Sequence, residues 1–187
     1  MGRNNLVFRR LVILGDTIEV WHSTQSSPRR RPRERLVRQS GAIGPESDAK
    51  LASTTVAVIG VSGGGSHVIQ QLAHQGVGNL MAIDDQLVEE SNLGRLIGAT
   101  EADIDITPKT TVAHRTAHGI DSSINLTESR ARFPSSETIA SLKEADIIVA
   151  CLDTFRAREA INAFCRRYLI PLIDIGIAIR SQAWPAR

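Results

Sequence analysis

A glycine-rich segment that follows a short apolar run constrains the fold of this chain more than any other feature. Val56–Ile59 is rich in β-branched residues, as a buried parallel strand is, and it leads directly into Gly60–Ser66, which reads Gly-Val-Ser-Gly-Gly-Gly-Ser. Glycine in such a turn lets the backbone approach a ligand closely. Ser66–Gln75 then places its apolar residues on one helical face, and the free N–H groups at a helix start suit an anion. The sequence therefore predicts a strand, an anion-binding turn and a helix.

A second strand completes this unit. Asn79–Asp84 is mostly apolar and ends in an acid roughly two dozen residues after Gly60, near the spacing at which a carboxylate meets the ribose hydroxyls of a nucleotide. Two alternatives stay open at this point. The glycines could serve a tight connection with no ligand, and the segment does not separate NAD from ATP, although the classical dinucleotide pattern has glycine where this chain has Ser62.

The order of the remaining elements predicts the fold class. We expect an α/β, Rossmann-like, mostly parallel sheet with helices on both faces and a short N-terminal hairpin extension. Ligands of such sheets bind at the carboxyl ends of the strands, where Gly60, Asp84 and Asp153 all fall. The expected strands are 55–60, 79–84, 124–126, 146–152 and 171–177, and the expected helices are 65–75, 108–119, 136–144 and 155–168.

The first part of the chain differs from the rest. A hairpin is expected around Gly15-Asp16, followed by a polar, proline-broken and basic linker at 23–35. We divide the chain into an N-terminal extension at 1–40 and a nucleotide-binding domain at 41–187. The arginines of the linker are not interleaved with aromatic residues, and the net charge is only +2, so no nucleic-acid partner is expected.

Composition sets the broad class of protein. A chain of 187 residues with 42% hydrophobic content can bury a substantial core. No apolar run approaches the roughly 20 residues of a membrane span, and the first residues lack the features of a signal peptide, so we expect a cytoplasmic protein that does not bind membranes. Cys151 and Cys165 form no Cys-x-x-Cys pair, so no zinc site is expected, and both thiols are expected to act as small core residues.

Three later motifs make the chain similar to a known family. Ser91–Arg95 reads Ser-Asn-Leu-Gly-Arg, Lys109 follows Thr-Pro, and Cys151–Asp153 reads Cys-Leu-Asp. With the glycine turn and Asp84, these motifs resemble the ThiF/MoeB/HesA family over roughly Arg38 to Ile179. Members of that family are bacterial relatives of ubiquitin-activating enzymes. The resemblance implies an adenylyltransferase that uses ATP and Mg²⁺ to adenylate the C-terminal carboxylate of a ubiquitin-like or sulfur-carrier protein.

The resemblance also implies a role for each matching residue. An arginine at the position of Arg38 reaches the partner's active site in family dimers, so a homodimer is expected. The cations Arg95 and Lys109 would stabilise the charge that develops at the α-phosphate. The implied site is catalytic Arg38, Arg95 and Lys109, nucleotide-binding Gly60, Gly63, Gly65, Asp84 and Asn92, and metal-binding Asp153.

Some positions depart from the family pattern. The second acid of the usual Asp-x-Asp is Gln86 here, and the adjacent Asp85 is not counted as a ligand. Family members continue beyond the strand at 171–177, often with a catalytic cysteine and a four-cysteine zinc site, so the chain is expected to lack the family's C-terminal part. The alternatives are therefore a truncated or inactive domain that binds nucleotide or dimerises and, less favoured, an NAD-dependent oxidoreductase, which would not explain Asn92, Arg95, Lys109 and Asp153 together.

Overall fold

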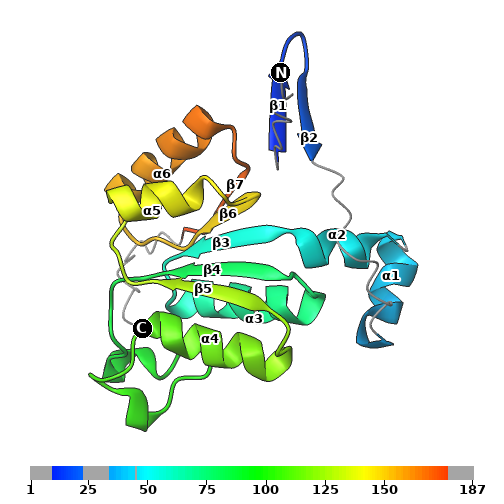
Figure 1. Cartoon of the computed structure of the whole chain (residues 1–187). Helices are drawn as coiled ribbons and strands as arrows, with labels where there is room; N and C mark the ends of the chain where they lie inside the picture. Colours follow the sequence, from blue (N-terminus) through cyan, green and yellow to red (C-terminus); the bar gives the residue numbers. More distant parts are fainter. Residues whose placement is uncertain (1–9, 23–33, 45, 177–187) are drawn as a thin grey trace, which may run out of the picture.

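Five parallel strands form the sheet that the alternation of elements predicts (Figure 1). The computed structural model describes residues 10–22, 34–44 and 46–176. Its main sheet has the order β5-β4-β3-β6-β7, so the chain moves outward from β3 in one direction and then, after β5, crosses back to the other side of β3. The strands are β3 Thr55–Ile59, β4 Asn79–Ile83, β5 Asn125–Ser129, β6 Ile147–Ala150 and β7 Leu172–Asp174.

The central strand β3 is buried along its whole length, which explains its uninterrupted apolar sequence. Its register places Val56 beside Leu80 of β4 and Ile147 of β6. Because side chains alternate across a sheet, Val56 and Val58 belong to one core cluster, whereas Ala57 and Ile59 belong to another. Each face of the sheet therefore has its own hydrophobic core, as expected of a sheet covered on both sides.

Helices cover both faces of this sheet. In Figure 1, α3 and α4 lie on one face and α5 and α6 on the other. The side chain of Ser135 accepts a hydrogen bond from the Thr138 N–H and starts α5, and Thr154 caps α6 in the same way. The helices and 3₁₀ turns are η1 Glu34–Leu36, α1 Val37–Ile43, α2 Ser47–Ser53, α3 Gly63–Gln75, η2 Glu90–Asn92, η3 Glu101–Asp103, α4 Lys109–Ile120, α5 Ser136–Leu142 and α6 Phe155–Tyr168. Within the described ranges, no helix is both long enough and apolar enough to cross a membrane.

The expected N-terminal hairpin is present as a separate antiparallel pair, β1 Arg10–Leu14 and β2 Ile18–His22, around the Gly15-Asp16 turn. Most of the expected linker lies outside the described residues. The helices α1 and α2 were not predicted, and α1 runs across the position between residues 40 and 41 at which the sequence was divided. The division into two domains stays a prediction.

Tertiary contacts explain why α1 and α2 have no clear sequence signal. Leu36, just before α1, is buried, and a Cβ at Gly76 would lie 2.6 Å from its Cδ1 atom. Leu51 of α2 packs against the core cluster that contains Val56, and the Gly78 N–H donates to the Leu51 carbonyl. Each helix has only seven residues. Elements this short depend on packing more than on propensity.

Candidate functional site

A cavity of about 420 Å³ lies at the carboxyl ends of β3, β4 and β6, where the fold class predicts a ligand. Its volume is within the range of small-molecule sites. It is lined by residues from the glycine turn, from the loop after β4, from the β5–α5 connection and from the end of β6. Five predicted site residues line it together: Gly60, Gly63, Asp84, Arg95 and Asp153.

The glycine turn passes close to neighbouring backbone, and this explains two of its glycines. Gly60 has a φ of 86°, and a Cβ there would lie 2.5 Å from the Cys151 carbonyl oxygen. A Cβ at Gly65 would overlap the Gly60 carbonyl oxygen. Gly65 is buried and does not line the cavity. Its visible role is to let the start of α3 pack against the end of β3, and direct contact with a nucleotide stays a prediction.

Asp84 shapes the turn as well as lining the cavity. Its Oδ2 atom accepts a hydrogen bond of 2.7 Å from the Val61 N–H, and its Oδ1 atom accepts one of 3.0 Å from the Gln86 N–H. Burial raises the pKa of Asp84, although these two hydrogen bonds and the charge of Lys109 oppose the increase. Both oxygens retain lone pairs that can accept from ribose hydroxyls.

Two residues of the Ser-Asn-Leu-Gly-Arg motif have different places: Asn92 shapes the loop, whereas Arg95 lines the cavity. Asn92 is buried, and its Oδ1 atom accepts a hydrogen bond from the Glu89 N–H in a reciprocal cap that shapes the 3₁₀ turn η2. It does not line the cavity. The Arg95 side chain does so, with its Nη1 atom donating to the Ser91 carbonyl at 2.6 Å. Arg95 therefore brings a positive charge to the glycine turn, whereas nucleotide contact by Asn92 stays a prediction.

Lys109 lies behind the wall of the cavity. It is the first residue of α4 and has an exposed fraction of only 2%. Its Nζ atom donates a hydrogen bond of 2.7 Å to Oε1 of Gln86, which does line the cavity. The lysine ammonium group is therefore bonded directly to a residue of the cavity wall.

The end of β6 supplies the remaining predicted residue. Asp153 is exposed and lines the cavity together with Cys151, two residues before it. Burial and then the charge of Asp174 raise the pKa of the Cys151 thiol to about 11. Burial raises the pKa of Cys165 to about 11 as well. Both thiols are therefore protonated at neutral pH. Cys165 is buried in the core as expected, whereas Cys151 is half-buried and lines the cavity.

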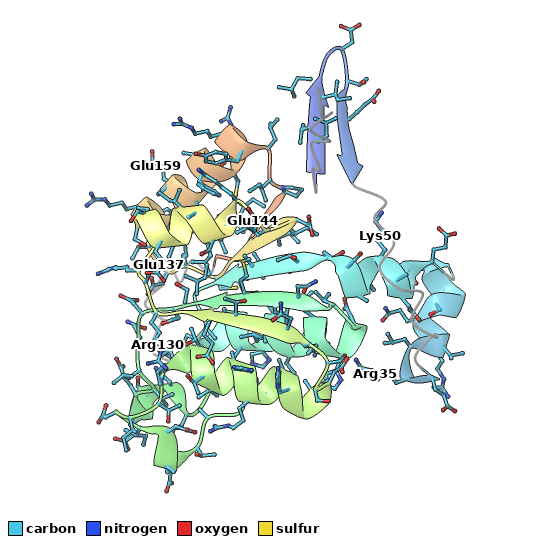
Figure 2. The ribbon with its side chains drawn as sticks, in the orientation of Figure 1. Arg35, Lys50, Arg130, Glu137, Glu144 and Glu159 are labelled. Atoms are coloured by element: carbon cyan, nitrogen blue, oxygen red, sulfur yellow. The ribbon has the colours of Figure 1, made fainter. Side chains whose placement is uncertain are left out.

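Arg38 lies far from the cavity of its own chain. Beside it on α1, the Gln39 side chain donates to the carbonyl of Gln75, the last residue of α3. The cavity is at the other end of α3, about 20 Å along a helix of 13 residues. Arg35, labelled in Figure 2, forms an ion pair of 2.6 Å with Asp121, which follows the end of α4. This part of the chain is therefore anchored away from the carboxyl ends of the strands.

A profile of the ThiF family matches residues 35–186. The chain belongs to the ThiF family. In this ThiF-family chain, the fold brings the glycine turn, Asp84 and Asp153 together around one cavity.

Similar proteins include an activating enzyme and an adenylyltransferase that are each named for the protein they act on. The SAMP-activating enzyme E1 of Haloferax volcanii is 35% identical over 135 residues, which cover 72% of this chain and 50% of that protein. The sulfur carrier protein ThiS adenylyltransferase of Escherichia coli strain K12 is 34% identical, with 70% of this chain and 52% of that protein covered. This ThiF-family chain therefore spans about half the length of the curated relatives that it matches.

Two solved structures show the same fold. The E. coli tRNA N6-threonylcarbamoyladenosine dehydratase TcdA in complex with ATP superposes with a TM-score of 0.69 and 25% identity, over 76% of this chain and 58% of that one. E. coli MccB with ATP superposes with a TM-score of 0.68 and 28% identity, over 79% of this chain and 46% of that one. The Rossmann-like fold predicted for this ThiF-family chain is thereby confirmed.

Sequence reasoning missed the wall of the cavity that follows β5. Ala131, Arg132 and Phe133 line it, and the Nε atom of Arg132 lies 4.0 Å from Oδ2 of Asp85. Figure 2 labels Arg130, the residue before this segment. No family motif marks these positions, but they follow the carboxyl end of a strand, which is the one signal that could have found them.

The residues present fit a nucleotide with a divalent cation. The glycine turn and the start of α3 suit phosphates, and Asp84 can accept from ribose. Asp153 offers a hard oxygen ligand of the kind that Mg²⁺ takes together with water and phosphate oxygens. In the part of the chain that the structure describes, no three His, Cys, Asp or Glu side chains form a group that could hold a metal ion alone. Such a cation would therefore depend on the nucleotide for most of its ligands.

Proposed function

We propose that this chain binds Mg-ATP in the cavity and adenylates the C-terminal carboxylate of a ubiquitin-like or sulfur-carrier protein in the cytoplasm. One observation carries the nucleotide part of the proposal. A glycine turn, an acid for ribose, an arginine and a second acid line a single cavity at the carboxyl ends of the strands, although they come from distant parts of the sequence. The names of the relatives support the carrier part, because two of them are named for SAMP and ThiS.

The proposed reaction makes an acyl-adenylate. A carboxylate oxygen of the carrier attacks the α-phosphorus of ATP, the bond from that phosphorus to the bridging oxygen of the β-phosphate breaks, and pyrophosphate leaves with the electron pair. Negative charge accumulates on the phosphate oxygens as the bonds change. Fixed positive charge lowers the barrier to such a step. Arg95 lies at the cavity and supplies this charge directly.

The divalent cation of the proposed site would bind at Asp153. When bound by Asp153, Mg²⁺ neutralises part of the phosphate charge. The residues of the chain then position the substrates: the glycine turn holds the phosphates, and Asp84 holds the ribose. Positioning of this kind supplies much of the catalysis in phosphoryl and nucleotidyl transfer.

The position of Arg38 supports a dimer in which two chains share their sites. Arg38 is exposed on α1 and lies about 20 Å from its own cavity. Such a cation cannot act on ATP bound in the same chain. We therefore assign Arg38 to the cavity of a second copy.

Calorimetric titration of the 187-residue chain with Mg-ATP tests the nucleotide part of the proposal. We expect binding that requires Mg²⁺, is lost in Asp153→Ala and is strongly weakened in Arg95→Ala. Ile173→Ala is the matched control, because Ile173 is exposed on the edge strand β7 and does not line the cavity. Binding of NADH in place of Mg-ATP would refute the proposal in favour of an oxidoreductase.

ATP–pyrophosphate exchange tests the chemistry. Exchange is expected only with a carrier protein, of which ThiS is one candidate, and Lys109→Ala and Arg95→Ala should abolish it without unfolding the chain. Nucleotide binding without exchange across a panel of such carriers would instead indicate a domain that only binds nucleotide or dimerises.

Mixing two inactive variants tests the shared site. Arg38→Ala lacks the cation given to the partner, and Asp153→Ala lacks the metal ligand. In a mixed dimer, one cavity has an intact Asp153 and receives an intact Arg38, so exchange should return to about a quarter of the wild-type rate if dimers form at random. No recovery in the mixture would refute the role across the dimer.

A further inference from the structure

Gln86 stands where the family pattern has a second carboxylate, and the structure shows what its amide does. Its Oε1 atom accepts a hydrogen bond of 2.7 Å from Nζ of Lys109, and its backbone carbonyl accepts one of 3.1 Å from the Lys109 N–H. Gln86 is exposed and lines the cavity, whereas Lys109 is almost completely buried. Two hydrogen bonds thus fix the first residue of α4 to the cavity wall.

The side chain that Lys109 is bonded to is an uncharged amide, and this affects the electrostatic potential in the cavity. A buried ammonium group needs hydrogen-bond acceptors, and either an amide or a carboxylate can supply one. A carboxylate would also cancel the positive charge, whereas an amide leaves it. Asp84 is the nearby acid whose pKa responds to the charge of Lys109, and it also accepts from the backbone of the glycine turn. Among the residues that the structure describes, no carboxylate is bonded directly to the Lys109 ammonium group, so its positive charge remains at the wall formed by Gln86.

We propose that Gln86 is a positioning residue that holds Lys109 against the cavity and keeps its charge available to the phosphates of the bound nucleotide. This inference rests on the function proposed above. It gives a function to the glutamine that replaces the second acid of the family pattern at this position. The Lys109 ammonium group has three N–H donors, so one can stay on the Gln86 amide oxygen while another donates to a phosphate oxygen, and the backbone hydrogen bond to Gln86 keeps the residue in place.

A double-mutant cycle on nucleotide affinity tests whether Gln86 acts through Lys109. Gln86→Met keeps the length of the side chain but removes the acceptor, and it should weaken Mg-ATP binding about tenfold, the usual scale of one charged hydrogen bond. In a Lys109→Met background the same change should alter affinity less than about twofold, because the group that it positions is gone. Gln86→Asn, whose amide is one methylene short of Nζ, serves as the second variant if the methionine chain does not fold.

Gln86→Glu tests the importance of a neutral partner. Glutamate retains the acceptor, so the urea midpoint should stay near the wild-type value. It adds a negative charge, so Mg-ATP affinity should fall about tenfold at low ionic strength, and this loss should shrink in about 1 M salt. A residue that only stabilised the loop would show no coupling to Lys109 in the double-mutant cycle.

The outcomes separate this inference from the proposed function. If the wild-type chain binds Mg-ATP and Gln86→Met weakens binding only when Lys109 is present, the inference is supported. Equal affinity of the wild-type, Gln86→Met and Gln86→Asn chains, or an equal loss in both lysine backgrounds, overturns the inference and leaves the proposed function intact. Absence of Mg-ATP binding by the wild-type chain refutes the proposed function and the inference together.

Discussion

Replacing Gly65 by alanine tests whether the glycine turn is shaped by backbone contact as the structure indicates. The new Cβ would overlap the Gly60 carbonyl oxygen and would lie 2.9 Å from its carbonyl carbon. Carbon atoms in contact prefer about 3.5–4.0 Å. The start of α3 must therefore move by roughly 1 Å from the end of β3. The two atoms of Gly60 that the new Cβ would meet belong to the backbone, so no side-chain rotation relieves the overlap.

The cost follows from this displacement. Overpacking of a close-packed region costs about 1–3 kcal/mol, and the better helix propensity of alanine returns less than about 1 kcal/mol. We therefore expect Gly65→Ala to lower the free energy of unfolding by about 2 kcal/mol. With a urea m-value of about 2 kcal/mol/M, the unfolding midpoint shifts down by about 1 M.

Gly64→Ala is the matched control, one residue earlier in the same helix turn. Its Cβ would lie 3.6 Å from the Cβ and Sγ atoms of Cys151, an ordinary contact. Urea unfolding followed by circular dichroism should therefore show a midpoint for Gly64→Ala at or above that of the wild-type chain. If Gly65→Ala unfolds at the wild-type midpoint, the close approach of helix and strand is not what requires glycine there.

Three further predictions concern stability and reactivity. Arg115, with help from Thr100, holds the pKa of the buried Asp103 well below its usual range, so the Asp103 carboxylate stabilises the fold above about pH 4 and this contribution is lost as the pH falls further. Asp103→Asn should therefore make the free energy of unfolding depend less on pH below about pH 4, and it should lower that free energy by about 1–3 kcal/mol at neutral pH. Ile161 is fully buried on α6, so Ile161→Ala should cost about 2–5 kcal/mol in urea unfolding, and a loss below about 1 kcal/mol would contradict the packing of α6 on the sheet. The raised pKa values of Cys151 and Cys165 predict that iodoacetamide at neutral pH alkylates the folded chain much more slowly than the urea-unfolded chain, and equal rates would contradict the raised pKa values of the thiols.

The sequence predicted the part of the fold that depends on local patterns. The apolar strand β3, the glycine turn and the helix α3 follow directly from periodicity and glycine placement, and they lie where expected within two residues. Parallel pairing then brings Gly60, Asp84 and Asp153 to one edge of the sheet, because strands of this type present their carboxyl ends together. For these three residues, their position at the end of a strand was enough to predict their place in the site.

The rest of the site depends on contacts that no local pattern records. Lys109 and Asn92 match family motifs, yet one lies behind Gln86 and the other caps its own turn. The direction of a side chain depends on which partner it finds across the fold, and the glutamine that receives Lys109 is 23 residues away in the sequence. The wall at Arg132 has the same origin, since its place in the cavity comes from the pairing of β5 with β4.

Asp84 shows why the fold and the candidate site cannot be separated in this chain. An ionised carboxylate has about four lone-pair positions, and the backbone N–H groups of Val61 and Gln86 occupy one on each oxygen. One of these bonds holds the glycine turn, and the other holds the loop that carries Gln86 to Lys109. The remaining positions on the same two oxygens suit the two hydroxyls of a ribose. A nucleotide bound there would therefore be positioned by the same carboxylate that sets the geometry of the phosphate turn and of the lysine, and loss of Asp84 would disturb all three together.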